Sequence, residues 1–416
     1  MERLVPVFYG NYGKYISRFR AIPYHIDIFR PVERRMLLSL YDVARNKFVK
    51  SAKVVGHCMG NYHPHAEAYG TLVRLVKTGF AIGQGNWGSI GLEEDPPAAM
   101  RYTEVKLDPK FEELAFKYIK YVPWKEYEFA LEPEYLPSPI PLGLVGNTGV
   151  NQGIAFHRTS IPTFTIQDLF YALYIVLGIE KNEEFKLLPY LIGHEIIEYD
   201  YNYYYTGKGY VTFRPIVVQG KDKKQVELRG VPQSKSKFYK FIENNNLEIY
   251  DYTSKDIKIV IKGNRKIDLQ KLDQAISNKI SYDILLVDEA GHVFRKSVEK
   301  IIIDTYESYK NAYANFLNDS IQKLEERISE LMIIKKIKEV LRKKSINSIE
   351  ELHKSIPDVP LDRLKQITDK YSIRRLVNIE VNIPQVTMEK EETEKRLNFL
   401  NRSIKQEIKK VAKSFV

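Results

Sequence analysis

The 416-residue sequence has little cysteine and no long hydrophobic run. Its one cysteine, Cys58, excludes a disulfide framework and fits a reducing compartment. No apolar run reaches the roughly 18 residues that a transmembrane helix needs, so we expect no membrane association. The first ten residues also lack the charged start and apolar stretch of a signal peptide. These absences favour an intracellular, cytoplasmic protein, and a hydrophobic content of 44% is enough to form packed cores.

Positive charge is in excess and unevenly distributed. The chain has 64 Lys and Arg against 53 Asp and Glu, which gives a net charge of +11. Residues 1–90 contain 13 Lys and Arg but only 5 Asp and Glu, so most of the excess lies in the first fifth of the chain. An acidic partner such as nucleic acid would explain this pattern, although a merely soluble basic protein would have the same net charge.

Helical spacing of apolar residues begins after Pro31. One amphipathic stripe occupies positions i, i+4, i+5, i+8 and i+11, at Val32, Met36, Leu37, Leu40 and Val43. Shorter helices are predicted from Ser51, as N-cap, to Met59 and over residues 67–77. Three short helices with basic residues between them are typical of a helix-turn-helix module. The glycine-rich residues 83–91 then predict a loop or wing.

The later parts of the chain have different patterns. Residues 190–300 are rich in β-like segments, with helices expected near 235–244 and 269–278, which predicts an α+β domain. Leucines recur every seven positions over residues 306–343, and residues 387–411 repeat this signal in a second long helix. We expect an antiparallel coiled coil with a compact tip between its helices; an ordinary helical hairpin is the alternative.

Two groups of residues could carry chemistry. In the segment Ala98–Glu104, Arg101 precedes Tyr102, and an arginine beside a tyrosine could hold a phosphate while the phenol reacts with it. The second group contains three histidines and the cysteine, which could bind zinc although their spacing fits no standard four-ligand pattern: His57, Cys58, His63 and His65. No phosphate-binding P-loop motif occurs.

The order of short motifs along the chain resembles one family, the A (breakage-reunion) subunits of type IIA DNA topoisomerases. This family includes gyrase A, the A-type subunit of topoisomerase IV and the medium subunits of T-even phage enzymes. The matching blocks are RAIP, RPVERR, KSAKVVG, YHPH, GQGNWGSI, AAMRYTE, LPSPIP, GNTGVNQGIA and YTGKGYVTFR. They extend over nearly the whole chain, and their combination is specific although each block alone is weak.

The resemblance implies an α+β multidomain fold. The expected parts are an N-terminal arm (1–19), a winged-helix (helix-turn-helix) DNA-gate domain (20–155), an α/β tower domain (156–302) and a long antiparallel coiled coil (303–416) with a globular dimerisation tip (346–386). The chain ends at Val416, just after the second long helix, so we expect it to lack the family's C-terminal wrapping domain.

The resemblance also implies roles for single residues. Tyr102 matches the nucleophile that becomes linked to the 5′ end of DNA, and Arg101 matches the cation that holds the scissile phosphate. His65 and Arg20 match supporting catalytic residues. Positions expected to contact DNA are Arg30, Arg34, Arg35, Lys50, Lys53 and His63. Val150 matches an apolar wedge between base steps, usually isoleucine in the family; a buried strand valine is the alternative.

Partners follow from the same resemblance. The substrate is double-stranded DNA, and the expected complex is A2B2, with a homodimer of this chain joined through residues 346–386. A separate ATPase/Toprim subunit would bind the Mg²⁺ and the ATP, so no metal site is expected in this chain. The reaction would be ATP-dependent strand passage at a nucleoid or a viral replication site. A non-catalytic, dimeric winged-helix protein that binds DNA for architecture is the alternative, and Tyr102 discriminates between the two.

Overall fold

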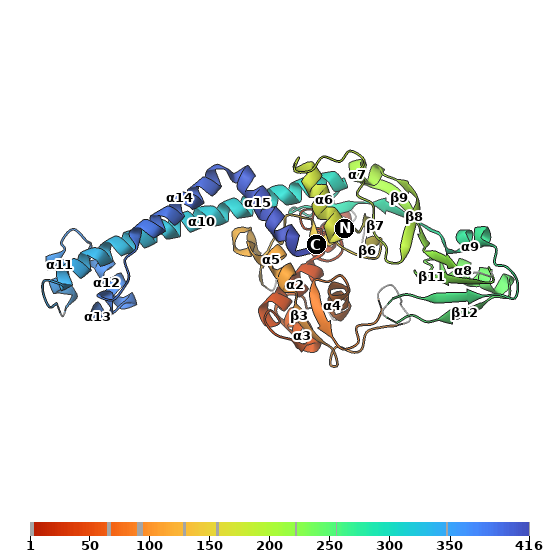
Figure 1. Ribbon diagram of the computed structural model, residues 1–416, viewed down its shortest axis with the longest axis horizontal. Coiled ribbons are helices and arrows are strands. Elements are labelled where there is room, and N and C mark those ends of the chain that lie inside the picture. The colour runs from red at the N-terminus through yellow and green to blue at the C-terminus, as the bar shows by residue number, and fades with distance from the viewer. Residues whose placement is uncertain are drawn as a thin grey trace. The chain divides into compact units, whose positions relative to one another are not determined.

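The computed structural model describes residues 4–64, 68–89, 95–127, 130–154, 158–220, 223–254, 256–346 and 348–415. The chain divides into two compact units, Met1–Tyr309 with Lys410–Val416, and Lys310–Lys409. Helices and several small sheets together confirm the predicted mixture of α and β structure (Figure 1). Within the described ranges, no helix is both long and apolar enough to cross a bilayer.

The N-terminal part of the first unit combines helices with a small antiparallel sheet of order β1-β3-β2. Its helical elements are α1 (Leu4–Ile16), a π-helical turn η1 (Ser17–Ala21), α2 (Pro31–Val43), α3 (Ser51–Asn61) and α4 (Ala68–Lys77). Its strands are β1 (Val49–Lys50), β2 (Ala81–Gln84) and β3 (Glu104–Leu107). The helices α2, α3 and α4 contact one another pairwise, and β3 contacts α2, so the sheet closes one side of the helical cluster.

The predicted helices of this region exist, with corrected boundaries. Met36, Leu37 and Leu40 of the predicted stripe are fully buried, which explains why α2 forms the centre of the cluster. The prediction that Ser51 is the N-cap of α3 is wrong, because Lys50 takes that position. The Ser51 hydroxyl instead lies 2.8 Å from the hydroxyl of Thr103. The predicted wing begins as strand β2 and becomes irregular after Gln84.

Short elements connect this cluster to the next sheet, as the proline- and glycine-rich sequence indicates. They are α5 (Pro109–Phe116), η2 (Ile119–Tyr121), β4 (Trp124–Glu126), β5 (Leu131–Pro133) and η3 (Leu142–Leu144). Asp108 caps α5 by accepting hydrogen bonds from the amides of Lys110 and Phe111, which satisfies two of the free amides at the helix start.

A five-stranded sheet of order β6-β7-β14-β9-β8 follows. Its strands are β6 (Val150–Ile154), β7 (Arg158–Pro162), β8 (His194–Asp200), β9 (Lys208–Pro215) and β14 (Asn278–Asp283). Nearby elements are α6 (Ile166–Val176), α7 (Asn202–Thr206) and the hairpin of β15 (Leu285–Val287) and β16 (Val293–Arg295). All strand pairs of the sheet are antiparallel.

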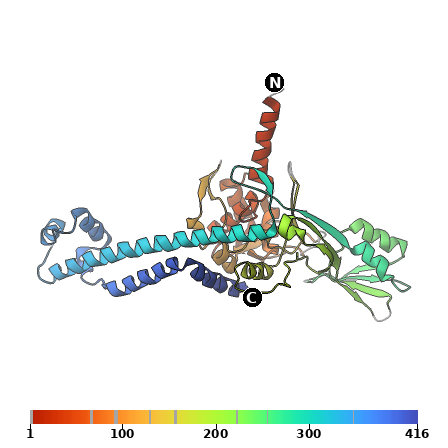
Figure 2. The ribbon, with the colours of Figure 1, turned by 90° about the horizontal axis from the view of Figure 1, so that it is seen from above.

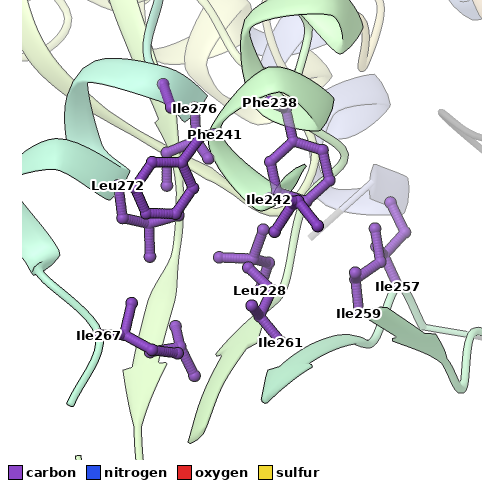
Figure 3. Packing of buried hydrophobic residues seen from close by; sticks show 12 residues of the cluster. Leu228, Phe238, Phe241, Ile242, Ile257, Ile259, Ile261, Ile267, Leu272 and Ile276 are labelled. Atoms are coloured by element: carbon purple, nitrogen blue, oxygen red, sulfur yellow. The ribbon is translucent and has the colours of Figure 1, made fainter. Parts of the chain in front are cut away.

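A second sheet, of order β10-β11-β13-β12, is inserted between β9 and β14. Its strands are β10 (Val217–Gln219), β11 (Gln225–Leu228), β12 (Glu248–Asp251) and β13 (Ile259–Lys262), and its helices are α8 (Lys235–Asn244) and α9 (Leu269–Ile276). Figure 3 shows Phe238 and Ile242 of α8 pointing toward Leu228 and Ile261 of the strands, and Phe241 lying beside Leu272 of α9. This separate apolar core stabilises the insertion.

The second unit is helical. It contains most of α10 (Val298–Leu341), then α11 (Ile349–Ser355), α12 (Leu361–Lys370), α13 (Ile373–Leu376), α14 (Ile383–Asn398) and much of α15 (Leu400–Ala412), which η4 (Lys413–Phe415) follows. The helix α14 returns alongside α10 (Figures 1 and 2), and an ion pair of 2.8 Å joins Lys390 to Glu325. The short helices pack on the end of α10 through an apolar cluster that includes Leu331, Ile334 and Leu364.

The predicted heptad pattern is confirmed in part for α10, where Leu324 is only half buried, and is incomplete for the returning helix. Leu317 and Leu331 of the seam are buried. The second long helix is interrupted at Phe399, which separates α14 from α15 and is 65% exposed. The finer domain boundaries proposed from the sequence remain a prediction.

Candidate active site

Tyr102 lies in a tight turn that leads into β3. Its backbone amide donates a hydrogen bond of 2.8 Å to the carbonyl of Ala99, which closes the turn. The side chain is 64% exposed, and Tyr205 is similarly exposed at 61%. The phenol is therefore accessible to a large substrate without any movement of the backbone.

The beginning of α3 anchors this turn. The amide of Ser51 donates to the carbonyl of Thr103 at 3.0 Å, and the amide of Ala52 donates to the carbonyl of Met100 at 3.2 Å. Amides in the first turn of a helix have no partner within the helix, so these two bonds satisfy groups that would otherwise need water. On the other side, Gly85 has φ of +95°, and a side chain there would come within 3.4 Å of the Tyr102 carbonyl. The turn is thus anchored by α3 and lies close to the Gly85 backbone, while Met100, Arg101 and Tyr102 are exposed.

Arg101 is the exposed neighbour of Tyr102, and its guanidinium carbon lies 4.6 Å from the centre of the Tyr102 ring. A cation in this position is attracted by the face of the ring. Its planar donors can also hold a phosphate through two hydrogen bonds. A phosphate that reaches the phenol would therefore meet a guanidinium at the same place. The structure brings together the two residues that the sequence singled out for this chemistry.

Three of the predicted DNA contacts, Arg34, Arg35 and His63, are buried, and their contacts with DNA remain predictions. The Arg34 guanidinium makes two bonds to the Asp27 carboxylate, of 2.8 and 2.9 Å, and both side chains are almost fully buried. Arg35 donates to Glu132 at 2.9 Å, and its Nη1 lies 3.1 Å from Nδ1 of His63, which is also buried. These arginines are internal ion pairs, so this arrangement does not present them to a DNA backbone.

Other predicted cations remain accessible. Arg20, in η1, and Lys53, on α3, are exposed. Lys50 is exposed directly before α3 and forms an ion pair of 2.9 Å with Glu104, the first residue of β3. Lys50 therefore lies on the strand pair that supports the tyrosine turn. His65, the other predicted supporting residue, lies outside the described residues, and the roles of these residues remain predictions.

Arg30 lies beside the strand that begins with Val150. Its side chain bonds to the fully buried Glu33, and its Nη1 lies 3.5 Å from the carbonyl of Gln152 on β6. Arg74 of α4 contacts the same carboxylate. Burial alone would raise the pKa of Glu33, but the charges of Arg74 and Arg30 outweigh it and hold that pKa below its usual value. The three side chains together have one excess positive charge.

Val150 itself is half buried at the start of the edge strand β6. The residue before it, Gly149, has φ of +72°, and a side chain there would approach Phe213 and Leu191 to 3.2 and 3.3 Å. The hydroxyl of Thr148 donates to the Val150 carbonyl at 2.9 Å. Val150 thus follows a tightly constrained turn, and its role as a wedge remains a prediction.

The alternative zinc site receives no support from the described residues. In that part of the chain, no group of three or more His, Cys, Asp or Glu side chains is placed to hold a metal ion. Cys58 is completely buried, and burial raises the pKa of its thiol to about 11. His65, the fourth proposed ligand, lies outside the described ranges.

Sequence reasoning missed the residues that support the turn and the acids that neutralise the buried arginines. Thr103 follows the tyrosine directly, and Tyr69 is on α4, but neither has a distinctive motif of its own. Glu132 is 97 positions from Arg35, so no local spacing could pair them. The only local signal was Thr103, which directly follows Tyr102 in the block AAMRYTE.

Comparison with known proteins identifies the family of this chain. The sequence model that describes the A subunits of DNA gyrase/topoisomerase IV matches residues 20–415. The chain therefore belongs to the family of DNA gyrase and topoisomerase IV A subunits, which are type IIA topoisomerase subunits.

Individual relatives cover different parts of the chain. The A subunit of DNA topoisomerase 4 from Staphylococcus epidermidis is 26% identical over 94% of this chain and 61% of its own length. The A subunit of DNA gyrase from Borreliella burgdorferi is 34% identical over 57% of this chain and 32% of its own length. The topoisomerase 4 A subunit of Staphylococcus aureus is 39% identical over 39% of this chain and 22% of its own length. The chain thus spans less than two thirds of these curated relatives.

Proposed function

We propose that this protein is the DNA-cleaving subunit of an ATP-dependent type IIA topoisomerase. In this proposal it makes a transient double-strand break through Tyr102, and a second duplex passes through the break to relax or decatenate DNA. The observation that carries the proposal is an exposed phenol, held on an anchored turn with a guanidinium 4.6 Å from its ring. Membership of the family of gyrase and topoisomerase IV A subunits supports it.

The proposed reaction is a transesterification. The phenol oxygen of Tyr102 loses its proton and forms a bond to the phosphorus of a DNA phosphodiester. The bond from phosphorus to the 3′ oxygen breaks, that oxygen gains a proton, and the 5′ phosphate remains on the tyrosine. One phosphate ester replaces another, so the reverse attack by the 3′ hydroxyl reseals the strand without an energy source.

The other residues have supporting roles in this proposal. Arg101 orients the scissile phosphate and stabilises the negative charge that develops on it. Arg20 and His65 support the same phosphate. Lys50 and Lys53 hold the adjacent backbone through contacts that do not depend on base sequence. Arg30 holds it next to the β6 strand, where Val150 wedges between base steps and bends the duplex.

Further features of the proposal concern the assembly. The cluster of α2, α3, α4 and the β1-β3-β2 sheet acts as a winged-helix DNA gate, and the two later sheets form the tower. The tip at residues 346–386 joins two copies of the chain. A B-type ATPase/Toprim subunit completes an A2B2 complex inside the cell, at a nucleoid or a viral replication site. Mg²⁺ held by that B-type protein would stabilise charge on the phosphate and on the leaving oxygen.

Covalent capture tests the proposal directly. The chain is mixed with a B-type partner, plasmid and Mg²⁺ and then denatured rapidly, and DNA-linked peptide is identified by mass spectrometry. We expect the label on Tyr102, and its complete loss in Tyr102→Phe or when EDTA removes the metal ion.

A matched control is Tyr205→Phe, because Tyr205 is 61% exposed, almost as much as Tyr102. This variant should form the covalent product normally. If Tyr102→Phe still became linked to DNA, another residue would be the nucleophile and the role proposed for Tyr102 would be wrong. If no link formed on any residue with several B-type partners, the non-catalytic DNA-binding alternative would replace the proposal.

A further inference from the structure

Three hydroxyl groups form a chain beneath the tyrosine turn. Thr103 and Ser51 are completely buried, and their hydroxyl oxygens lie 2.8 Å apart. The Thr103 hydroxyl also lies 3.0 Å from the phenol oxygen of Tyr69. That phenol donates to the carbonyl of Ala98 at 2.7 Å, at the other end of the turn. The chain therefore spans the segment from Ala98 to Thr103 from below.

Each of the three residues belongs to a different element. Ser51 begins α3, Tyr69 is on α4, and Thr103 connects the turn to β3. The Tyr69 ring also lies near the buried ring of Trp87, with ring centres 6.2 Å apart, in the loop that follows β2. The amide of Ala98 in turn donates to the carbonyl of Asn86 in that loop. The hydroxyl chain thus connects α3, α4 and the loop through one point below Tyr102.

Burial makes this connection sensitive to the number of hydroxyl groups. The Thr103 hydroxyl donates to Ser51 Oγ, the Tyr69 phenol donates to the Ala98 carbonyl, and the Thr103 and Tyr69 oxygens contact each other, so Thr103 is the central member of the chain. Loss of the central hydroxyl would leave the buried Ser51 hydroxyl without that partner and the half-buried Tyr69 phenol with only the Ala98 carbonyl. The turn would then lose one of its supports and keep only the backbone hydrogen bonds that hold it, so a small shift of the turn becomes possible while the fold remains intact.

We propose that Tyr69, Thr103 and Ser51 are positioning residues that fix the Tyr102 phenol relative to the scissile phosphate and couple its placement to α4. This inference rests on the proposed function. The geometry matters because a displacement of about 1 Å at a reacting group can reduce a rate about 100-fold. None of the three residues contacts the reacting atoms, so their effect is on the rate of cleavage and not on the affinity for DNA.

The first arm of the test compares two substitutions at one position. Thr103→Val keeps the shape of the side chain and removes the hydroxyl, whereas Thr103→Ser keeps the hydroxyl. In the reconstituted complex we expect Thr103→Val to form the covalent Tyr102 product roughly 10–100-fold more slowly in a single turnover. We expect Thr103→Ser to restore most of that rate, and both variants to bind plasmid as the parent does. Tyr69→Phe should reproduce the valine effect.

A matched control separates positioning from stability. Thr159 is also completely buried, and its hydroxyl accepts from the amide of Leu285 at 3.1 Å and contacts the carbonyl of Asp283 at 3.3 Å. Thr159→Val therefore removes a comparable hydroxyl from the five-stranded sheet. Normal cleavage by Thr159→Val supports the proposal. A loss equal to that of Thr103→Val, or an unimpaired Thr103→Val, overturns it.

The second arm uses this chain alone and does not depend on catalysis. Hydrogen exchange should show faster exchange at the amides of Ser51 and Ala52 in Thr103→Val, and parental rates in Thr103→Ser. Unchanged protection in the valine variant contradicts the positioning role. If instead Tyr102→Phe still forms the covalent link, the proposed function fails, and the exchange arm continues to report on the hydroxyl chain by itself.

Discussion

The arginines of α2 and the arginine of the tyrosine turn belong to the same compact unit and carry the same charge, but their environments are opposite. Arg34 is buried and bound to Asp27 through two hydrogen bonds. Arg101 is exposed, and it contacts the ring of its neighbour. In the first region the fold neutralises the side chains, and in the second the fold immobilises the backbone and leaves the side chains free.

This difference indicates where charge is structural and where it is available for chemistry. A buried arginine without a carboxylate would be very costly, so Asp27 and Glu132 are required by the fold. At the turn, by contrast, the amides of α3 hold carbonyl groups, and neither Arg101 nor Tyr102 is needed for anchoring. We therefore expect mutations in the first region to affect stability and mutations in the second to affect the reaction.

The largest effect on stability should come from Asp27→Ala. It leaves Arg34 buried without a counterion and also removes the acceptor for the amides of Phe29 and Leu136. We expect a loss of about 3–5 kcal/mol in the free energy of unfolding, measured by urea denaturation. The matched control is Asp283→Ala, since Asp283 makes the same two-bond contact with Arg295 at an exposed site. That change should cost less than about 1 kcal/mol, and equal losses would refute the distinction.

Arg101→Ala should have a large effect on cleavage and almost none on stability. Removal of a cation that stabilises developing charge should slow formation of the covalent Tyr102 product by roughly 10²–10³-fold in a single turnover. Because the side chain is exposed, the free energy of unfolding should change by less than about 0.5 kcal/mol. Arg101→Lys should recover only part of the rate, since lysine lacks the planar pair of donors. A normal rate in the alanine variant would remove Arg101 from the site.

The smallest expected effect is that of Lys50→Ala. Its ion pair with Glu104 is exposed, so the free energy of unfolding should change by less than about 1 kcal/mol. If Lys50 contacts one phosphate, the slope of log affinity for duplex DNA against log salt should decrease by about 0.9. Glu104→Gln breaks the same ion pair but keeps the cation, so that slope should persist. Identical slopes in all three proteins would exclude Lys50 from the DNA contact.

The spacing of apolar residues predicted much of the fold because it shows which side of a single helix is buried. The spacing of Met36, Leu37 and Leu40 located α2, and that of Leu317 and Leu331 located the buried side of α10. The break at Phe399 has no proline or glycine to signal it. The hydroxyl of Ser403 donates to the carbonyl of Arg396, seven residues earlier, and this bond across the break stabilises the interruption.

The site was predictable only where its residues are adjacent in the chain. Arg101 and Tyr102 are neighbours, so their contact needs no knowledge of the fold. Arg35 can be buried because Glu132, 97 positions later in the sequence, neutralises its charge. Basic residues that look equivalent in the sequence therefore differ in exposure, depending on whether a carboxylate from a distant part of the chain pairs with them. The sequence predicts only a local capping role for Ser51, because its hydroxyl partner Thr103 is 52 positions away and no local pattern links the two.

Cys58 has a practical consequence for spectroscopy. The only thiol of the chain is completely buried, and its raised pKa keeps it protonated at neutral pH, so alkylating dyes react with it slowly. The native cysteine therefore does not need to be removed before an introduced cysteine is labelled with a thiol-reactive dye. A single substitution at an exposed position, such as Met388→Cys on α14, 70% exposed in the parent chain, would introduce one fluorophore site for following movements of the helical unit.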